Sequence, residues 1–343
     1  MKPKEVEPMW IFSSVLRALA VAVLGAVMVT PAIGQAVKIG YNPRLPQLPL
    51  YIAKDKGFFT EEKVDAQLVS SGQATPALLP LLARGDLDVV FGGPSAALFN
   101  AFSDGIRFRI VADGGQAAPD FSGYPYSLVV RKDLFDKGEF RTLADLKGKT
   151  VSFGAQGTTL AYMMFQGLVR AGIQPKEVNI RYFNSVPDMG VALKNQGIDA
   201  SAMISPFDAT LQKKGIGVVW KDARQLAPGM QVYVLIFSQR LAANADLSKR
   251  VLVAYLKAIR WYWMALKEKK PELVSIAAKW TKIPPATIEV SPMTYYDKDG
   301  RVNVADIENQ QSTWVRQGLV TKPVDVKQLV DLQPLEAALK DLH

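Results

Sequence analysis

The chain of 343 residues contains no cysteine and only one histidine, His343, which is its last residue. Without cysteine there are no disulfides, no thiolate metal sites and no thiol nucleophile. With its one histidine at the terminus, an internal Ser-His-Asp triad and a histidine-based metal centre are nearly excluded too. We therefore expect no catalytic residue, no metal and no cofactor. The chemistry that remains is hydrogen bonding, charge and aromatic contact, which is the chemistry of binding.

The first residues have the pattern of an export signal. Lys2, Lys4 and Arg17 precede an apolar stretch of twelve residues, 18–29, and small residues follow at 30–36. A basic start, a short apolar segment and an A-x-A-like site are typical of a secretory signal peptide. Twelve residues fall short of the ~20 that span a bilayer, which disfavours a membrane anchor. We predict that residues 1–34 are a cleavable signal peptide and that the mature protein is periplasmic, without a lipid anchor.

The charge is moderately positive. The whole chain carries a net charge of +9, and removing the three basic and two acidic residues of 1–34 leaves +8. Such a surface can favour anionic ligands or membrane surfaces. The mature chain has no long run of Lys and Arg, so we expect no nucleic-acid partner. We also expect no stable membrane insertion after the signal peptide is cut.

Short strand patterns alternate with helical patterns along the mature chain. Helices end at glycines such as Gly57, Gly85 and Gly197, which are natural helix stops. The alternation predicts an α/β fold in which mostly parallel sheets are flanked by helices. The expected strands lie at 37–41, 66–69, 87–91, 107–112 and 126–130, and the rhythm restarts with 149–153, 179–183 and 199–204. An apolar strand at 232–237 follows, and beyond it the chain has helical spacing.

Two motifs suggest chemistry that their spacing does not support. Gly148-Lys149-Thr150 resembles the end of a phosphate-binding loop, but the glycine needed five positions earlier is Leu143. Asp297-Lys298-Asp299-Gly300 resembles part of a calcium loop, but its first ligand position would be Tyr295, which cannot supply a carboxylate. We expect a tight hairpin turn there instead.

Loops that follow strands are the stronger signal. Five segments rich in Gly, Ser, Thr or Pro each lie between a strand and a helix: 43–48, 71–75, 92–95, 156–159 and 205–207. In open parallel sheets such loops meet at the carboxyl edge, where ligands bind. Glycines allow close approach of the backbone, and helix N-termini attract anions. Together these loops predict a binding cleft.

Several segments resemble the solute-binding proteins of ABC importers, in the nitrate/sulfonate/taurine and thiamine-pyrimidine-precursor branch. The similarity runs from about Val37 to Trp220. It rests on the segments Lys38-Ile39-Gly40-Tyr41, PLYIAKDKGFF at 49–59, LARGDLDV at 82–89, DLKGK at 145–149 and Ile198-Asp199-Ala200. The resemblance implies a type II-like two-lobed fold with two crossover segments, closing on a ligand like a hinged trap. With the restarted rhythm, it predicts a first lobe at 37–126, a second lobe at 127–231 and a return to the first lobe at 232–343.

The resemblance further implies a monomeric, non-enzymatic binding protein that delivers a small molecule to an ABC permease with its cytoplasmic ATPase. A periplasmic sensor for a signalling receptor is one alternative. Another is a pyrimidine-precursor synthase, which the branch also contains. That activity depends on an internal histidine, which this chain lacks.

Arg44 is the leading candidate for an anionic ligand, because its planar fork binds two oxygens of a sulfonate or carboxylate at once. A solvated loop position is the competing interpretation. An aromatic or heterocyclic ligand stacked on Tyr41, Tyr124 or Phe207 remains the other possibility. The full set of predicted ligand-binding residues is Arg44, Gln47, Leu48, Gln73, Gly93, Ser95, Gln156, Gly157, Thr158, Thr159, Ser205 and Phe207.

Overall fold

The structure is a computed structural model that describes residues 36–70 and 75–342. The predicted signal peptide and Gln73 lie outside these residues. In the described residues, no helix is long and apolar enough to cross a membrane.

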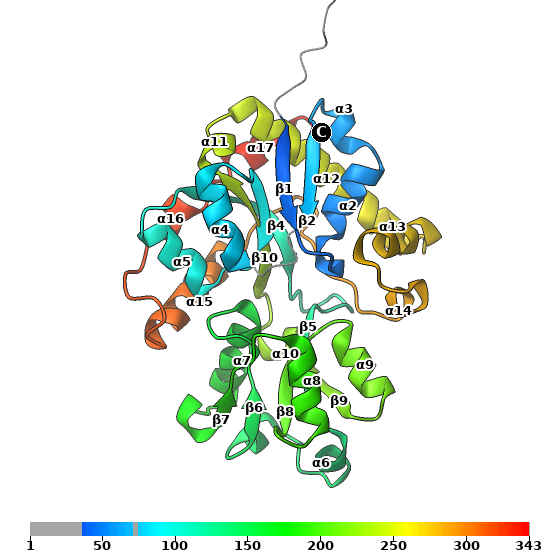
Figure 1. Cartoon of the computed structure of the whole chain (residues 1–343), viewed down its shortest axis with the longest axis vertical. Helices are drawn as coiled ribbons and strands as arrows, with labels where there is room; N and C mark the ends of the chain where they lie inside the picture. Colours follow the sequence, from blue (N-terminus) through cyan, green and yellow to red (C-terminus); the bar gives the residue numbers. More distant parts are fainter. Residues whose placement is uncertain (1–35, 71–74, 343) are drawn as a thin grey trace, which may run out of the picture. The chain divides into compact units, whose positions relative to one another are not determined.

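Two five-stranded sheets organise the described chain (Figure 1). The first has the order β2-β1-β3-β10-β4 and the second β7-β6-β8-β5-β9. The first sheet consists of β1 (Val37–Tyr41), β2 (Ala66–Ser70), β3 (Val89–Gly92), β4 (Phe108–Gln116) and β10 (Gln231–Ser238). The second consists of β5 (Tyr126–Arg131), β6 (Thr150–Ser152), β7 (Asn179–Arg181), β8 (Ala200–Ile204) and β9 (Gly217–Asp222). Each sheet with the helices that cover it is called a lobe below.

Both sheets are mixed in the same way. In the first, β10 runs antiparallel to its neighbours β3 and β4, whereas β1 is parallel to β2 and β3. In the second, β5 runs antiparallel to β8 and β9, whereas β6 is parallel to β7 and β8. The predicted α/β class is confirmed, with one reversed strand in each sheet.

Helices cover both faces of the first sheet, which explains why its central strand β10 is apolar on both faces. Along β10, Val234 and Ile236 join one hydrophobic cluster and Leu235 and Phe237 the other, because neighbouring side chains point to opposite faces. The first cluster includes residues of α4 (Thr75–Arg84) and α5 (Ala96–Ser103). The second includes residues of α2 (Leu48–Asp55), α3 (Phe58–Glu61), α12 (Ala245–Lys267), α13 (Pro271–Thr281) and α17 (Gln333–Lys340).

The remaining helices complete the two lobes. In the first lobe they are α11 (Gln239–Ala242), α14 (Pro285–Glu289), α15 (Val304–Arg316), α16 (Val326–Leu329) and the 3₁₀ turn η1 (Leu45–Gln47). In the second they are α6 (Lys132–Asp136), α7 (Thr159–Arg170), α8 (Val186–Lys194), α9 (Phe207–Lys213), α10 (Ala223–Leu226), η2 (Leu143–Leu146) and η3 (Pro175–Glu177).

The chain passes between the sheets twice, from β4 to β5 and from β9 back to β10. Tyr126 is already the first residue of β5, and Gln231 the first of β10. The division at 37–126, 127–231 and 232–343 stays a prediction.

Two local expectations need correction. Strand β9 was not expected from the sequence; four of its six residues are only half-buried, so it lacks a continuous apolar run. Residues 297–300 do form a turn, in which the Gly300 N–H donates to the Asp297 carbonyl at 2.9 Å. The turn does not close a hairpin, because the flanking chain bonds to β4: the Asp113 N–H donates to the Gly300 carbonyl at 2.8 Å, and Tyr295 bridges to Gln116.

Candidate functional site

A cavity of about 160 Å³ is lined by residues of both lobes. The first lobe contributes Asn42, Arg44, Pro46 and Gln47 after β1, Phe91, Gly93 and Ser95 from the end of β3 and beyond, and Tyr233 from β10. The second contributes Tyr126 from β5, Ala155, Thr158, Thr159 and Leu160 after β6, Phe183, Asn184, Val186 and Met189 after β7, and Ile204 at the end of β8. The volume is below the ≈ 300–1,000 Å³ of typical ligand pockets, so the cavity suits a small molecule.

Strand direction explains why these residues meet. The carboxyl ends of parallel strands gather at one edge of each sheet, which places the loops after β1, β3, β6, β7 and β8 there. The reversed strands β5 and β10 present their amino-terminal ends at the same edge. Tyr126 and Tyr233 therefore reach the cavity from the beginnings of their strands.

The loop that carries Arg44 is held by the side chain of Tyr51. Its hydroxyl donates to the Asn42 carbonyl at 2.7 Å and accepts the Arg44 N–H at 3.2 Å. The ring of Tyr51 stacks on Trp280, with centroids 5.4 Å apart. Arg44 itself is exposed, and no carboxylate of residues 36–70 or 75–342 forms an ion pair with it. The loop thus holds a cation that has no protein counter-ion in the described chain.

Three hydroxyl groups form a chain beside Arg44. The Tyr126 and Thr159 hydroxyl oxygens are 2.9 Å apart, and the Tyr126 hydroxyl donates to that of Tyr233 at 3.0 Å. Burial raises the pKa of both tyrosines, and the nearby Arg44 guanidinium lowers it by a smaller amount. Both phenols are therefore neutral hydrogen-bond donors at physiological pH.

The two lobes touch directly beside the cavity. The Ala96 N–H, at the start of α5, donates to the Gly157 carbonyl in the loop before α7, at 2.9 Å. Gly93 is equally tight: a Cβ there would lie 2.8 Å from the Thr159 methyl group and 3.0 Å from the Val232 carbonyl. These contacts bring the carboxyl edges of β3 and β6 together around the cavity.

Comparison with known protein families gives one match, to the NMT1-like family, over residues 32–282. The chain belongs to the NMT1-like family. A search of curated proteins finds no match. The family assignment confirms the branch to which the sequence motifs pointed.

Solved structures with the same fold include sulfonate- and nitrate-binding proteins. The periplasmic aliphatic sulphonate binding protein SsuA of Escherichia coli is 21% identical, with a TM-score of 0.70 and coverage of 86% of this chain and 96% of SsuA. The alkanesulfonate-binding SsuA of Xanthomonas axonopodis pv. citri, bound to MOPS, is 21% identical, with a TM-score of 0.65 and coverage of 87% and 98%. The periplasmic nitrate-binding protein NrtA of Synechocystis is 14% identical, with a TM-score of 0.69 and coverage of 90% and 89%. This NMT1-like chain therefore has the two-lobed fold of periplasmic binding proteins.

Half of the residues predicted for ligand binding line the cavity of this NMT1-like protein. They are Arg44, Gln47, Gly93, Ser95, Thr158 and Thr159. Their role in binding stays a prediction, but the structure does bring them together. The expectation that Arg44 faces the cleft is consistent with its position in the lining.

The other predicted residues lie elsewhere, for reasons that the sequence does not show. Leu48 begins α2 and is buried in the core. Gln156 is exposed, and Phe207 is 45% exposed at the start of α9. Gly157 uses its carbonyl for the contact with Ala96 described above. Ser205 is buried, its hydroxyl has no partner among the described residues, and its N–H donates to the Pro125 carbonyl at 3.1 Å.

The aromatic candidates also differ from those expected. The Tyr41 ring packs against Tyr51 and Trp280, and the Tyr124 ring lies under the guanidinium of Arg224, 5.6 Å away. The aromatic rings that do line the cavity are Phe91, Tyr126, Phe183 and Tyr233. Phe183 follows a strand and precedes a helix, so the rule used for the other loops also indicates it. The two tyrosines required knowledge of which strands are reversed.

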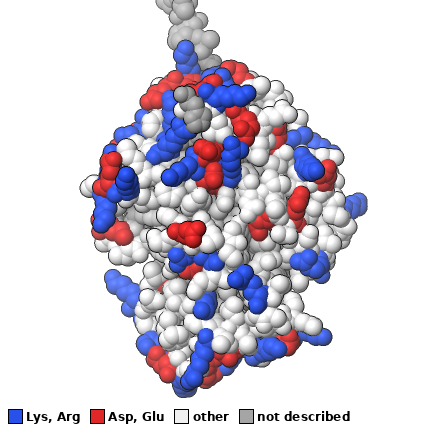
Figure 2. Space-filling view, turned by 180° about the vertical axis from the view of Figure 1, so that it is seen from behind, with Lys and Arg blue, Asp and Glu red and all other residues white. Residues whose placement is uncertain are grey.

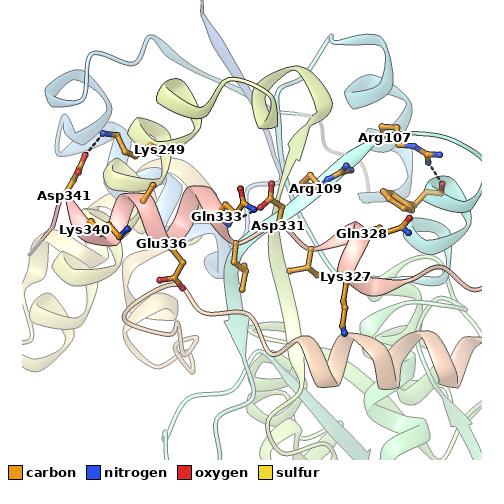
Figure 3. A pocket seen from close by; sticks show the side chains of 14 residues that line it. Arg107, Arg109, Lys249, Lys327, Gln328, Asp331, Gln333, Glu336, Lys340 and Asp341 are labelled. Carbon is orange, nitrogen blue, oxygen red and sulfur yellow. Dashed lines mark hydrogen bonds and ion pairs between the residues drawn. The ribbon is translucent and has the colours of Figure 1, made fainter.

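A larger surface basin of about 1070 Å³ lies on the first lobe alone (Figure 3). Three of its basic side chains are already engaged: Lys249 pairs with Asp341 at 2.7 Å, and Arg107 and Arg109 donate to the Phe102 and Phe108 carbonyls, each at 2.9 Å. Because one lobe lines it, movement between the lobes does not enclose it. The smaller cavity is the better candidate site.

The charged side chains do not gather into a stripe of one sign on the face shown in Figure 2, where basic and acidic groups are intermingled. A polyanion-binding surface usually presents clustered Lys and Arg. Arg44, which lines the cavity and forms no ion pair with a described carboxylate, is the more specific electrostatic feature.

Proposed function

We propose that this protein is the extracytoplasmic solute-binding component of an ABC importer. One observation carries the proposal: a small cavity between two lobes, lined by both and containing an arginine that has no carboxylate counter-ion among the described residues. Membership of the NMT1-like family and the fold shared with SsuA and NrtA support it. The ligand is a small anionic molecule of the sulfonate, nitrate or carboxylate type, with a heterocyclic molecule as the alternative.

The mechanism is hinge closure about the two passages between the sheets. A ligand that touches Arg44 on one lobe and the α7–α8 side on the other makes its full set of contacts only when the lobes are together. Such a ligand shifts the population toward the closed state. The lobes in this mechanism are 37–126 with 232–343, and 127–231.

The proposed setting follows from the predicted signal peptide. Residues 1–34 direct export, and the mature protein acts as a periplasmic monomer without a lipid anchor. Its partners are the small ligand and an ABC permease with its cytoplasmic ATPase. Neither a cofactor nor a nucleic acid is part of the proposal.

Two other functions are weaker. A sensor would use the same cavity and closure and would differ only in presenting the closed form to a receptor. Finding permease and ATPase genes beside the gene of this protein would favour the importer. A pyrimidine-synthase-like enzyme is disfavoured, because the chain has no internal histidine and begins with a predicted export signal.

Native mass spectrometry of freshly purified mature protein tests the proposal. We expect one small bound molecule that is lost on denaturation. Arg44→Ala should weaken its binding tenfold or more, since a charge-assisted hydrogen bond contributes about 1.5–3 kcal/mol. Arg181→Ala is the matched control, because Arg181 is exposed on β7 outside the cavity and should leave binding unchanged.

Small-angle scattering of the same samples measures closure. The ligand-bound protein should have a smaller radius of gyration than the ligand-free protein. Equal ligand binding by the wild type and Arg44→Ala would remove Arg44 from the site. Identical scattering with and without bound ligand would contradict hinge closure.

A further inference from the structure

The cavity lining has one charge and no counter-charge. Arg44 is the only charged side chain among the described residues that line it, and none of those residues is a carboxylate. Among the described residues, a bound molecule therefore meets one positive charge and no negative one.

Three polar side chains near Arg44 each accept one hydrogen bond and keep a donor hydrogen available. The Gln47 side-chain oxygen accepts the Asn42 N–H at 3.1 Å, which leaves its amide nitrogen as a donor. The Ser95 oxygen accepts the Leu98 N–H at 3.3 Å as the cap of α5. The Tyr233 oxygen accepts from Tyr126 at 3.0 Å. In the described chain no acceptor takes the remaining hydrogens of Gln47, Ser95 and Tyr233, so this side of the cavity suits an acceptor-only, anionic group.

The opposite side is mostly apolar. Its second-lobe lining includes Leu160, Phe183, Val186, Met189 and Ile204. The hydroxyl of Thr158 is used within its own loop, where it donates to the Ala155 carbonyl at 2.7 Å. Asn184 adds a neutral amide at an exposed position. Burying a hydrocarbon chain or an aromatic ring of the ligand against an apolar surface of this kind favours binding.

We propose that the cavity selects an organic monoanion with an uncharged, apolar body. The anionic group binds Arg44 and the donors of Gln47, Ser95 and Tyr233, and the body lies against the α8 side of the second lobe. This inference rests on the proposed function and narrows its ligand class. It makes the apolar residues Val186 and Met189 determinants of specificity.

Ligands that share the same anionic head group should therefore differ in affinity according to the charge of the rest of the molecule. An ammonium group on the body would be desolvated with no carboxylate to pair with, which is costly. A second negative charge on the ligand would have no second cationic side chain in the described lining to pair with. An inorganic anion would leave the apolar wall uncovered.

Isothermal titration of the ligand-free mature protein with isosteric pairs tests this selectivity. The first pair is butane-1-sulfonate and 3-aminopropane-1-sulfonate, which differ by a methyl group against an ammonium group. The second pair is pentanoate and 4-aminobutyrate, which tests the same difference with a carboxylate head. In at least one pair, we expect the compound with the uncharged body to bind at least tenfold more tightly than its amino partner. Nitrate should bind more weakly than that same compound. Equal or tighter binding of the amino compounds or of nitrate overturns the proposal, as does failure of all four organic probes to bind.

A variant that supplies the missing carboxylate provides the converse test. In Val186→Glu the new acid would stand in the cavity wall at the first residue of α8, a position where a helix tolerates an acidic residue. It should reduce the tenfold preference or reverse it in favour of the amino compound. Val191→Glu is the matched control, since Val191 lies on the same helix, is 56% exposed and does not line the cavity. An unchanged preference in Val186→Glu overturns the assignment of this wall.

The outcomes distinguish this inference from the proposed function. If native mass spectrometry finds a bound zwitterion or cation and scattering still shows closure, the inference fails and the binding-protein function stands. If no small molecule binds or closes the lobes, both fail.

Discussion

At the scale of single residues, Asp113 is the most unusual group outside the cavity. Its carboxylate is fully buried in β4, where its oxygens accept the N–H groups of Gly115 at 2.8 Å, Asp297 at 2.8 Å and the Gln231 side chain at 2.6 Å. Burial raises its pKa to about 7, in spite of these three donors, and the charge of Asp297 adds to the rise. Burial likewise raises the pKa of Asp208 and Asp306.

We predict that the protein loses stability as the pH rises from 5 to 8. Folded Asp113 keeps its proton up to about pH 7, whereas the unfolded chain releases it near 3.8. The stability that this proton contributes is complete below the unfolded pKa and is lost as the pH rises through the folded one. Urea titrations at pH 5, 6, 7 and 8 should show a fall in the free energy of unfolding on the order of a few kcal/mol.

Asp113→Asn should flatten this pH dependence while lowering stability at pH 5, because an amide cannot accept all three N–H groups. Asp120→Asn is the control, an exposed carboxylate that should leave the slope at its wild-type value. A wild-type slope that persists in Asp113→Asn would assign the effect to other groups.

At the scale of elements, the approach of β3 to the loop before α7 sets how closely the lobes meet. Gly93 permits it because the Thr159 side chain and the Val232 carbonyl occupy the space of a Cβ. The backbone bond between Ala96 and Gly157 lies beside it. The Gly93 contact joins the loop after β3 to the first residue of α7, and the backbone bond joins the start of α5 to the loop before α7.

We predict that Gly93→Ala weakens binding of the co-purified ligand about tenfold, because overpacking costs roughly 1–3 kcal/mol and 1.4 kcal/mol corresponds to a factor of ten. Titration calorimetry measures the affinity, and scattering should show a larger open population. Gly197→Ala is the matched control, since its Cβ would meet only the Ala192 carbonyl, at 3.5 Å. Unchanged affinity in Gly93→Ala would mean that the lobes need not approach this closely to bind.

At the scale of the whole molecule, one hydrophobic cluster runs through both lobes. It includes Leu98 and Phe99 of α5, Tyr162 and Phe165 of α7, and Trp314 of α15. The Trp314 ring is fully buried, 6.3 Å from Tyr162 and 6.1 Å from Phe165 between centroids. The Tyr162 hydroxyl donates to Asp306 at 2.7 Å, which adds a polar link between α7 and α15.

We predict that the wild type unfolds in a single calorimetric transition, because this shared cluster couples the lobes. Trp314→Ala should cost about 3–5 kcal/mol and separate the transition into two. Trp314→Phe should cost less, since it keeps an aromatic ring and removes an indole N–H that has no partner in the described structure. Two transitions in the wild type would show that the lobes unfold independently.

The sequence by itself determined the α/β class, most strand positions and three of the loops that line the cavity, because hydrophobic periodicity, helix-ending glycines and strand-to-helix loops are local signals. It indicated Arg44, Gln47, Gly93, Ser95, Thr158 and Thr159 by this local rule. Its motifs also pointed to the family that the comparison then assigned. Strand β9 was not predicted, because its half-buried residues show no clear hydrophobic periodicity.

Only the tertiary structure decided which side chains face the cavity. Tyr126 and Tyr233 line it because β5 and β10 run against their neighbours, and strand direction depends on pairing between residues far apart in the chain. Leu48 and Phe207 carry the same kind of local signal as the residues that line the cavity, yet one is buried in the core and the other is exposed. Local sequence specifies that a loop follows a strand, whereas the direction of each side chain depends on the packing of the whole fold.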